Sequence, residues 1–393
     1  MGVLALALLA VAVAWRAATE AAPPVRIART LTLSVRVPGG PPAFTWPAEG
    51  EAAVQAQGVA GAIASSGGQR PVAIASVAKV MTAYLTLLAH PLSAGQQGFA
   101  LTVTPADVAE EQRRSALDES ILPVRAGERI SEREALQALL LPSANNVAAL
   151  LAAHEGGVTA FVAGMNATAR RLGMRASTYT DPSGFEPSTV STALDQLRLA
   201  RAAMALPAFA TIVDERSVAL PVAGHVANYN ALVGQDGYVG VKTGSDAAAG
   251  GCLVFAKRAT RAGRAVSILG VVLGQRGGPL VEAALASAQR LGDSAAAALR
   301  VESVLPAGAR VLGVSAPDGR RTVAVTAGAL RTLTWSGLTL PVRVTARATA
   351  STLRTGQRVA TVSVGGSMPA ATAAVTLHPL AGPSLGWRLS HLL

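Results

Sequence analysis

The stretch GYVGVKTGSDAAAGGCLVFAKRATRAGRAVSILGVVL, residues 237–273, decides the fold. It holds three largely apolar runs, at 237–243, 251–257 and 264–273, and the five residues 259–263 form a turn between the last two. Short apolar runs joined by glycine-containing turns predict consecutive antiparallel strands. A helix is expected next, from about Pro279 to Leu291, with Gly292 as its C-terminal stop.

Strands and helices upstream of this meander complete the predicted fold. Ser131 followed by Glu134 forms a capping box that opens an apolar helix. Strands are expected at 51–65 and 72–75, and helices at 77–89, 131–141, 146–153 and 158–172. Strands, then many helices, then an antiparallel meander predict an α+β fold and not a parallel doubly wound sheet.

The last quarter of the chain has a different composition. Residues 294–393 are only the last quarter of the 393-residue chain, yet they contribute +8 of its net charge of +11. Short alternating strands are expected there at 322–326, 338–346, 358–364 and 373–377, and residues 386–393 are expected to be a last strand or a frayed end. The sequence therefore predicts a 23–47 linker rich in Pro and Gly, a main domain over 48–293 and a basic β-rich C-terminal domain over 294–393.

The N-terminus predicts export. The apolar run from Val3 to Trp15 suits a secretory signal and is shorter than the roughly 20 residues that cross a bilayer. No Lys or Arg precedes the run, which is atypical of a cleaved signal and favours an upstream start or an uncleaved anchor. Residues 1–22 are interpreted as a signal peptide or N-terminal anchor, with a buried N-terminal helix as the alternative. We expect an exported protein of the cell envelope. Cys252 is the only cysteine, which excludes an intramolecular disulfide.

Ser76-Val77-Ala78-Lys79 is the first group of residues that indicates chemistry. Positions i and i+3 share a helix face, so Lys79 can bring its amine against the Ser76 hydroxyl. A serine becomes a good nucleophile when a neighbouring base takes its proton, and a lysine is such a base once its pKa is lowered. The chain has 31 Arg and only three Lys, at 79, 242 and 257, so a lysine at this position is informative.

Two further motifs follow in the chain. Ser143-Ala144-Asn145 lies in a turn between two helices, where an N-cap role for Ser143 is the structural alternative. Lys242-Thr243-Gly244 ends a predicted strand on which alternation places Tyr238, Gly240 and Lys242 on one face. A solvated lysine is the alternative there, and Lys257 is expected at the surface. These alternatives do not explain why all three motifs occur, in this order, with two of the three lysines inside them.

The order S-x-x-K, S-x-N, K-T-G resembles the penicillin-recognising serine enzymes. The surrounding sequence, including Leu141–Asn146 and Asp181-Pro182-Ser183-Gly184-Phe185, is similar to low-molecular-weight penicillin-binding proteins of the D-alanyl-D-alanine carboxypeptidase family. The resemblance covers roughly residues 50–290. It implies a β-lactamase/transpeptidase-like antiparallel sheet with a helical cluster.

The resemblance also implies an activity, that of an exported serine D,D-carboxypeptidase. Ser76 would attack the carbonyl between the two terminal D-alanines of a peptidoglycan stem peptide and form an acyl-enzyme. Lys79 would accept the proton, and Ser143 would relay it to the leaving amine. β-Lactam antibiotics would acylate the same serine and stop there.

Substrate binding is implied for the remaining motif residues. Asn145 would bond the substrate backbone, while Lys242 and Thr243 would bind its terminal carboxylate. Gly244 would let the substrate lie close to the strand. The backbone N–H groups of Ser76 and Ser245 would form the oxyanion hole.

Three alternatives remain open at this point. An endopeptidase that cuts peptidoglycan cross-links uses the same residues. A serine β-lactamase needs a carboxylate for deacylation, for which Glu186-Pro187 is only a superficial match. A non-catalytic cell-wall-binding or β-lactam-sensing protein would be expected to have degraded motifs.

The sequence predicts neither a metal nor a cofactor. The five histidines, at 90, 154, 225, 378 and 391, show no H-x-H or H-x-x-x-H spacing. Nucleic acid is not an expected partner, because the basic domain lacks aromatic stacking platforms apart from Trp335 and Trp387. Contact of this domain with an anionic envelope polymer or a membrane surface is expected instead.

Overall fold

The structure is a computed structural model that describes residues 2–19, 23–27, 30–59, 62–347, 350–365 and 370–391. The chain divides into two compact units. The first comprises Met1–Pro42, Gly58–Ala62 and Leu299–Leu393, and the second comprises Ala43–Gln57 and Ile63–Ala298. The second unit carries all three motifs.

A five-stranded sheet forms the centre of the second unit. Its order is β10-β11-β12-β2-β3, and all neighbours are antiparallel. The strands are β10 (Tyr238–Asp246), β11 (Gly250–Arg261), β12 (Arg264–Gln275), β2 (Glu51–Ala56) and β3 (Ile63–Ser66). The predicted meander is confirmed. The prediction of one strand over 51–65 is wrong, because this segment is a hairpin of two strands.

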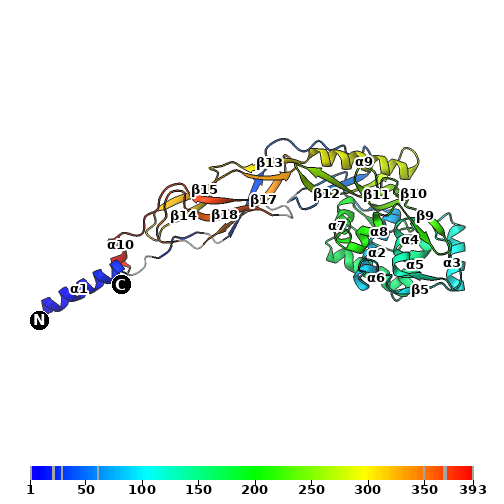
Figure 1. Cartoon of the computed structure of the whole chain (residues 1–393), viewed down its shortest axis with the longest axis horizontal. Coiled ribbons are helices and arrows are strands. Elements are labelled where there is room, and N and C mark those ends of the chain that lie inside the picture. The colour runs from blue at the N-terminus through cyan, green and yellow to red at the C-terminus, as the bar shows by residue number, and fades with distance from the viewer. Residues whose placement is uncertain are drawn as a thin grey trace. The chain divides into compact units, whose positions relative to one another are not determined.

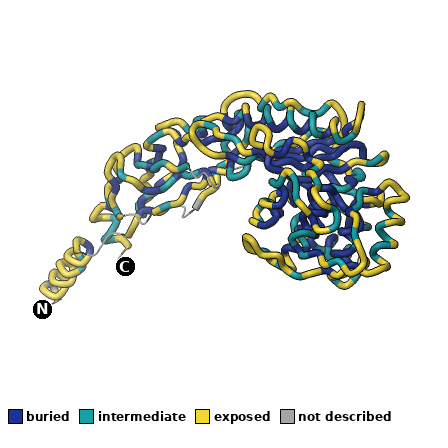
Figure 2. The backbone as a smooth tube through the Cα atoms, turned by 45° about the vertical axis from the view of Figure 1, so that its right-hand side comes forward, coloured by how far each residue is buried: buried dark blue, intermediate teal, exposed yellow. Residues whose placement is uncertain are grey.

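Helices cover both faces of this sheet, as Figure 1 shows. Helix α9 lies on one face, and α7, α8 and the short helix η1 contact the other. The helices are η1 (Ala75–Ala78), α2 (Lys79–Ala89), α3 (Pro105–Ser115), α4 (Glu132–Leu140), α5 (Asn145–His154), α6 (Val158–Arg171), α7 (Ala193–Ala203), α8 (Pro207–Val213) and α9 (Leu280–Ala298). Figure 2 shows the strands buried between these two layers. This arrangement confirms the predicted α+β class.

Helix α2 is the buried centre of the helical layer. Its Val80, Met81 and Ala83 are fully buried, and it packs against α4, α5, α6 and α7. The predicted capping box starts α4, because the Glu134 N–H donates to Ser131 Oγ at 3.2 Å and Glu134 Oε2 accepts from the Ser131 N–H at 2.8 Å. Three two-stranded pairs complete the unit: β4 (Val72–Ala73) with β7 (Val190–Ser191), β5 (Ala100–Thr102) with β6 (Arg129–Ser131), and β8 (Ser217–Leu220) with β9 (Gly224–Ala227).

Helix α9 continues past its predicted stop at Gly292 and ends at Ala298. A Cβ at Gly292 would lie 2.5 Å from Tyr238 Oη and 3.0 Å from the Phe255 ring. This glycine therefore lets the helix pack closely on the sheet, and it does not cap the helix. The same packing moves the expected domain boundary from 293 to 298.

Lys257 is buried beside this packing and is not the expected surface residue. It is 8% exposed, and its Nζ lies 2.9 Å from Asp293 Oδ1 and 4.3 Å from the centre of the Tyr238 ring. Burial of a lysine is tolerated when a carboxylate and an aromatic face compensate its charge.

The first unit contains a six-stranded antiparallel sheet of order β1-β17-β18-β19-β15-β14 and a separate pair, β13 with β16. Its strands are β1 (Thr30–Arg36), β13 (Arg300–Leu305), β14 (Arg310–Ser315), β15 (Arg321–Thr326), β16 (Leu330–Thr334), β17 (Thr339–Ala346), β18 (Arg358–Val364) and β19 (Ala370–Thr376). The four predicted C-terminal strands are confirmed.

The prediction of a linker over 23–47 is wrong. Residues Thr30–Arg36 form β1, which pairs with β17 over its whole length, and Val25 and Val37 are buried in the same core. Residues 386–391 also differ from the expected last strand, because Leu385–Ser390 is helix α10, capped by Ser384. Residues 392 and 393 lie outside the described residues.

The N-terminal run forms helix α1 (Gly2–Thr19), whose Leu4, Leu6, Leu8 and Trp15 are more than 60% exposed. Within the described ranges, no single helix has the length and apolar composition to cross a membrane. The bent pair of α5 and α6 passes that test together, but most of α5 is buried in the helical layer.

Candidate active site

The structure contains the predicted contact between Ser76 and Lys79. Lys79 Nζ lies 2.7 Å from Ser76 Oγ and donates to the Ser183 carbonyl at 2.9 Å. Lys79 is fully buried, and desolvation lowers the pKa of its amine well below the usual value, with help from the charge of Lys242. A lowered pKa makes the neutral amine accessible as a base for the serine proton.

A loop organised by Asp181 holds the Ser183 carbonyl against Lys79. Asp181 Oδ2 accepts from the N–H groups of Ser183, Gly184 and Phe185 at 3.0, 2.8 and 3.1 Å, and from Ser183 Oγ at 2.6 Å. Its Oδ1 accepts from Thr189 Oγ1 at 2.6 Å. One carboxylate therefore satisfies the donors of a whole turn. The sequence resemblance included this segment without giving it a role.

Asp181→Ala is expected to lower the free energy of unfolding by about 3 kcal/mol, because three backbone N–H groups lose a charged acceptor. Acylation should slow as well, since the Ser183 carbonyl loses its fixed position beside Lys79. Urea unfolding and a penicillin acylation rate would measure both effects. Asp181→Asn is the matched control, because its amide oxygen can replace Oδ2 while its NH₂ faces Thr189. Equal stability of Asp181→Ala and the wild type would contradict this role.

Ser143 lies in the connection between α4 and α5 with a left-handed backbone, φ +70°. Its alternative interpretation as an N-cap is wrong, because Ala144 is the N-cap of α5 and provides no side-chain bond. The Ser143 Oγ is buried, and none of the described residues offers it a hydrogen bond. A buried hydroxyl without a partner is costly to folding, which indicates a role outside stability.

Asn145 begins α5 and depends on a residue that sequence reasoning missed. Its Nδ2 donates to Glu119 Oε2 at 2.7 Å, and Arg114 forms an ion pair with the same carboxylate at 2.7 Å. The Asn145 Oδ1 has no hydrogen-bond partner within the described part of the chain. Glu119 thus fixes the orientation of the amide and leaves its acceptor oxygen available.

Lys242 is buried on β10, so the alternative of a solvated lysine is wrong. It is 1% exposed, desolvation lowers its pKa to about 7, and its Nζ donates to the Thr243 carbonyl at 2.9 Å. Tyr238 does not share its face. The Tyr238 hydroxyl donates to the Gln289 carbonyl on α9, whereas Lys242 is near Lys79 in the helical layer, and its charge lowers the pKa of Lys79. An irregularity in pairing between Tyr238 and Val241 offsets the expected alternation.

Gly244 permits the close approach of η1 to β10. A Cβ at this position would lie 3.0 Å from the Ser76 nitrogen and 2.9 Å from the Val77 nitrogen. The neighbouring Thr243 is buried, at 4% exposed. The missing side chain therefore makes room for the backbone of the serine itself, whereas the sequence had suggested room for substrate.

A cavity of about 270 Å³ connects these elements. Its lining includes Ser76, Asn145, Glu119 and Ser245, so both expected oxyanion-hole residues face one space. Lys242, Thr243 and Ser143 do not line this cavity. All three are buried, and each lies within three residues in sequence of the lining residues Asn145 or Ser245. Glu186, the superficial match to a β-lactamase carboxylate, lines a separate cavity of about 150 Å³.

Residues 49–277 match the family model described as D-alanyl-D-alanine carboxypeptidase, Peptidase S11. A D-alanyl-D-alanine endopeptidase of Pseudomonas aeruginosa is 33% identical over 217 residues, which are 53% of this chain and 66% of the relative. The D-alanyl-D-alanine carboxypeptidase DacB2 of Mycobacterium tuberculosis is 37% identical over 183 residues, 44% of this chain and 60% of that relative. The matches thus span slightly under two thirds of these curated relatives.

Solved structures agree on the fold. A variant of the Streptomyces K15 DD-transpeptidase superposes with a TM-score of 0.55 and 25% identity, covering 63% of this chain and 97% of that chain. The D-alanyl-D-alanine carboxypeptidase DacD of Francisella tularensis has a TM-score of 0.60 at 19% identity, covering 87% of this chain and 96% of that chain, a likeness of fold alone. The family model, which matches more than half of the residues, shows that this chain belongs to the peptidase S11 family of D-alanyl-D-alanine carboxypeptidases.

Proposed function

We propose that the protein is a serine D,D-carboxypeptidase that removes the terminal D-alanine from peptidoglycan stem peptides. The contact of 2.7 Å between Lys79 Nζ and Ser76 Oγ carries this proposal, because it pairs a nucleophile with a base whose pKa is lowered by burial. Ser76 Oγ attacks the carbonyl carbon of the penultimate D-alanine, and Lys79 takes the hydroxyl proton.

The tetrahedral intermediate then divides into an ester and a free amino acid. Its oxyanion accepts from the backbone N–H groups of Ser76 and Ser245. As the C–N bond breaks, the leaving nitrogen receives the proton through Ser143, whose unpartnered hydroxyl is suited to such a relay. Water then hydrolyses the acyl ester and restores Ser76. A β-lactam opens on the same serine and leaves a long-lived ester.

Lys242, Thr243 and Asn145 recognise the substrate in this proposal. A terminal carboxylate supplies the charge that favours protonated Lys242, whose pKa in the free site is about 7. Asn145 Oδ1 accepts from a substrate N–H, while Glu119 keeps its Nδ2 occupied. Peptide binding at the terminus should therefore weaken as pH rises through the titration of Lys242.

A D,D-endopeptidase acting on cross-links is the second candidate. Two similar relatives, from Pseudomonas aeruginosa and Escherichia coli, are described as D-alanyl-D-alanine endopeptidases, at 33% and 32% identity. The same nucleophile and base serve both reactions, because each cleaves a bond after D-alanine. The two differ only in whether the leaving group is free D-alanine or a side-chain amine of a second peptide.

We further propose that the protein is exported and acts in the cell envelope. The exposed apolar side chains of α1 suit a signal or anchor segment. The strands of the basic domain alternate, with Arg343 on β17 exposed between buried valines, which offers a cationic surface to anionic envelope polymers or lipid headgroups. Nucleic acid is not part of this proposal.

The experiment that tests the activity compares two substrates. With a defined pentapeptide ending in D-alanyl-D-alanine, we expect D-alanine release that a penicillin blocks in a time-dependent manner. With a purified cross-linked dimer, we expect at least tenfold slower cleavage. Faster cleavage of the dimer would assign the endopeptidase, and no reaction with either substrate together with no acylation would reject both.

A further inference from the structure

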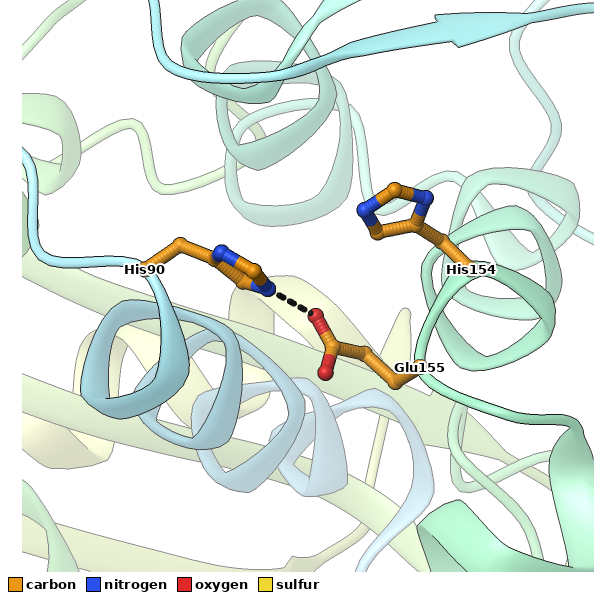
Figure 3. A group of neighbouring side chains, drawn as sticks. All are labelled: His90, His154 and Glu155. Carbon is orange, nitrogen blue, oxygen red and sulfur yellow. Dashed lines mark ion pairs between the residues drawn. The ribbon is translucent and has the colours of Figure 1, made fainter.

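The far ends of α2 and α5 bring together two histidines and a glutamate that the catalytic site does not use. His90 is the C-cap of α2, His154 is the last residue of α5, and Glu155 is the C-cap of α5. One ligand atom from each lies within 4.8 Å of the others, and His90 Nε2 is 2.8 Å from Glu155 Oε1. Figure 3 shows both imidazoles and the carboxylate directed toward one space. It is the one group of this kind among the described residues.

The surroundings favour a cation at this position. Two helices end here, and the C-terminal ends of helices carry partial negative charge. Imidazole nitrogen with carboxylate oxygen is a donor set that suits Zn²⁺ in a tetrahedral site. His90 and Glu155 are partly exposed and His154 is exposed, so an ion can reach the ligands from solvent.

Glu132 provides a second, independent observation. It is 1% exposed, and its Oε1 has no hydrogen-bond partner among the residues described. It lines a hollow of about 550 Å³ together with His90 and Phe99, and the charges of His90 and Glu155 act on it. A buried carboxylate oxygen without a partner is costly unless a cation or a bound water compensates it.

Phe99 fixes the orientation of the two imidazoles. Its ring stacks on His154 at a centroid distance of 4.1 Å and meets His90 edge-on at 4.9 Å. Such contacts hold the rings in position without using their nitrogens. Groups that orient the ligands in this way strengthen the binding of a metal ion.

We propose that His90, His154 and Glu155 bind one Zn²⁺ ion per chain, beside the hollow that His90 and Glu132 line. The site lies roughly 15 Å from the catalytic motifs, the length of a ten-residue helix, so the ion does not take part in the reaction. It joins the C-terminal ends of α2 and α5, whose first residues are Lys79 and Asn145, and η1 with Ser76 directly precedes α2. The ion therefore stabilises the helical layer that supports the catalytic residues.

The test uses the full chain without an affinity tag, stripped with a chelator and titrated with ZnCl₂. Calorimetry should give one ion per chain, and the unfolding temperature should rise by about 5 °C at a hundredfold excess over the dissociation constant. Mg²⁺ at the same concentration should produce no comparable shift, because it prefers oxygen ligands.

His154→Phe is the diagnostic variant, because it keeps a ring on Phe99 and leaves the pair of His90 and Glu155 intact. Its Zn²⁺ affinity should fall by at least about 100-fold. His225→Ala, an exposed histidine on β9, is the matched control and should bind as the wild type does. If His154→Phe does not fold by circular dichroism, Glu155→Gln serves in its place. Unchanged affinity in the diagnostic variant, loss in the control, or no stoichiometric binding by the wild type would overturn the proposal.

Discussion

Ser76→Ala is expected to abolish the covalent adduct with penicillin and to reduce the release of D-alanine to a residual rate. The variant removes the only atom that can form the ester, while the remaining cavity with Asn145 and Ser245 stays in place. Reversible binding of the peptide should persist, because Lys242 and Thr243 are unchanged. A loss of more than about 1000-fold in turnover is expected from removing a nucleophile. Intact-mass and peptide-mapping spectrometry of the protein incubated with a penicillin would measure the adduct.

The matched control is Ser65→Ala, an exposed serine on β3. It should form the adduct at the wild-type rate, with the added mass on the peptide that contains Ser76. An adduct of unchanged yield in Ser76→Ala would refute the assignment of the nucleophile. Labelling of Ser143 in the wild type would do so equally.

The sheet of the second unit was predictable because its strands are neighbours in sequence. β10, β11 and β12 follow one another, and turns rich in glycine mark their ends. β1 was missed because its partner β17 lies about 300 residues away, and because prolines precede it and a Pro- and Gly-rich segment follows it. Its alternation of Leu31, Leu33 and Val35 was the available signal. The end of α9 was missed because Gly292 serves packing, which no local pattern reports.

The candidate site likewise has contacts that the sequence predicts and contacts that only the structure shows. The pairing of Ser76 with Lys79 follows from helical spacing, so the sequence predicts it directly. Glu119 is one of many charged residues in its segment, and only the structure shows that it holds Asn145. His90 and His154 meet because α2 and α5 pack together, a contact between segments more than 60 residues apart. Spacing rules for metal ligands detect local pairs and cannot detect such a group.

Lys79→Met is the second variant with a large expected effect. Methionine fills nearly the same space but has no basic nitrogen, so Ser76 loses its proton acceptor. We expect penicillin acylation to slow by roughly 10²- to 10⁴-fold, the range typical for the loss of a general base. Lys79→Arg should be as slow, because a guanidinium keeps its proton at neutral pH. Stopped-flow acylation at pH 7.5 would measure all three proteins.

The pH dependence of stability in the same two variants tests whether Lys79 loses its proton in the folded protein. Desolvation lowers the pKa of Lys79 in the folded protein, whereas in the unfolded chain it stays near 10.5. Between these values the unfolded chain binds more protons, so the stability of the wild type falls as pH decreases from about 10.5 toward neutrality. Lys79→Met lacks this group, so its unfolding temperature should rise relative to that of the wild type as pH falls. Lys79→Arg should remain less stable than the wild type throughout. A difference between Lys79→Met and the wild type that does not change between pH 7 and pH 10 would show that Lys79 stays protonated and is not the base.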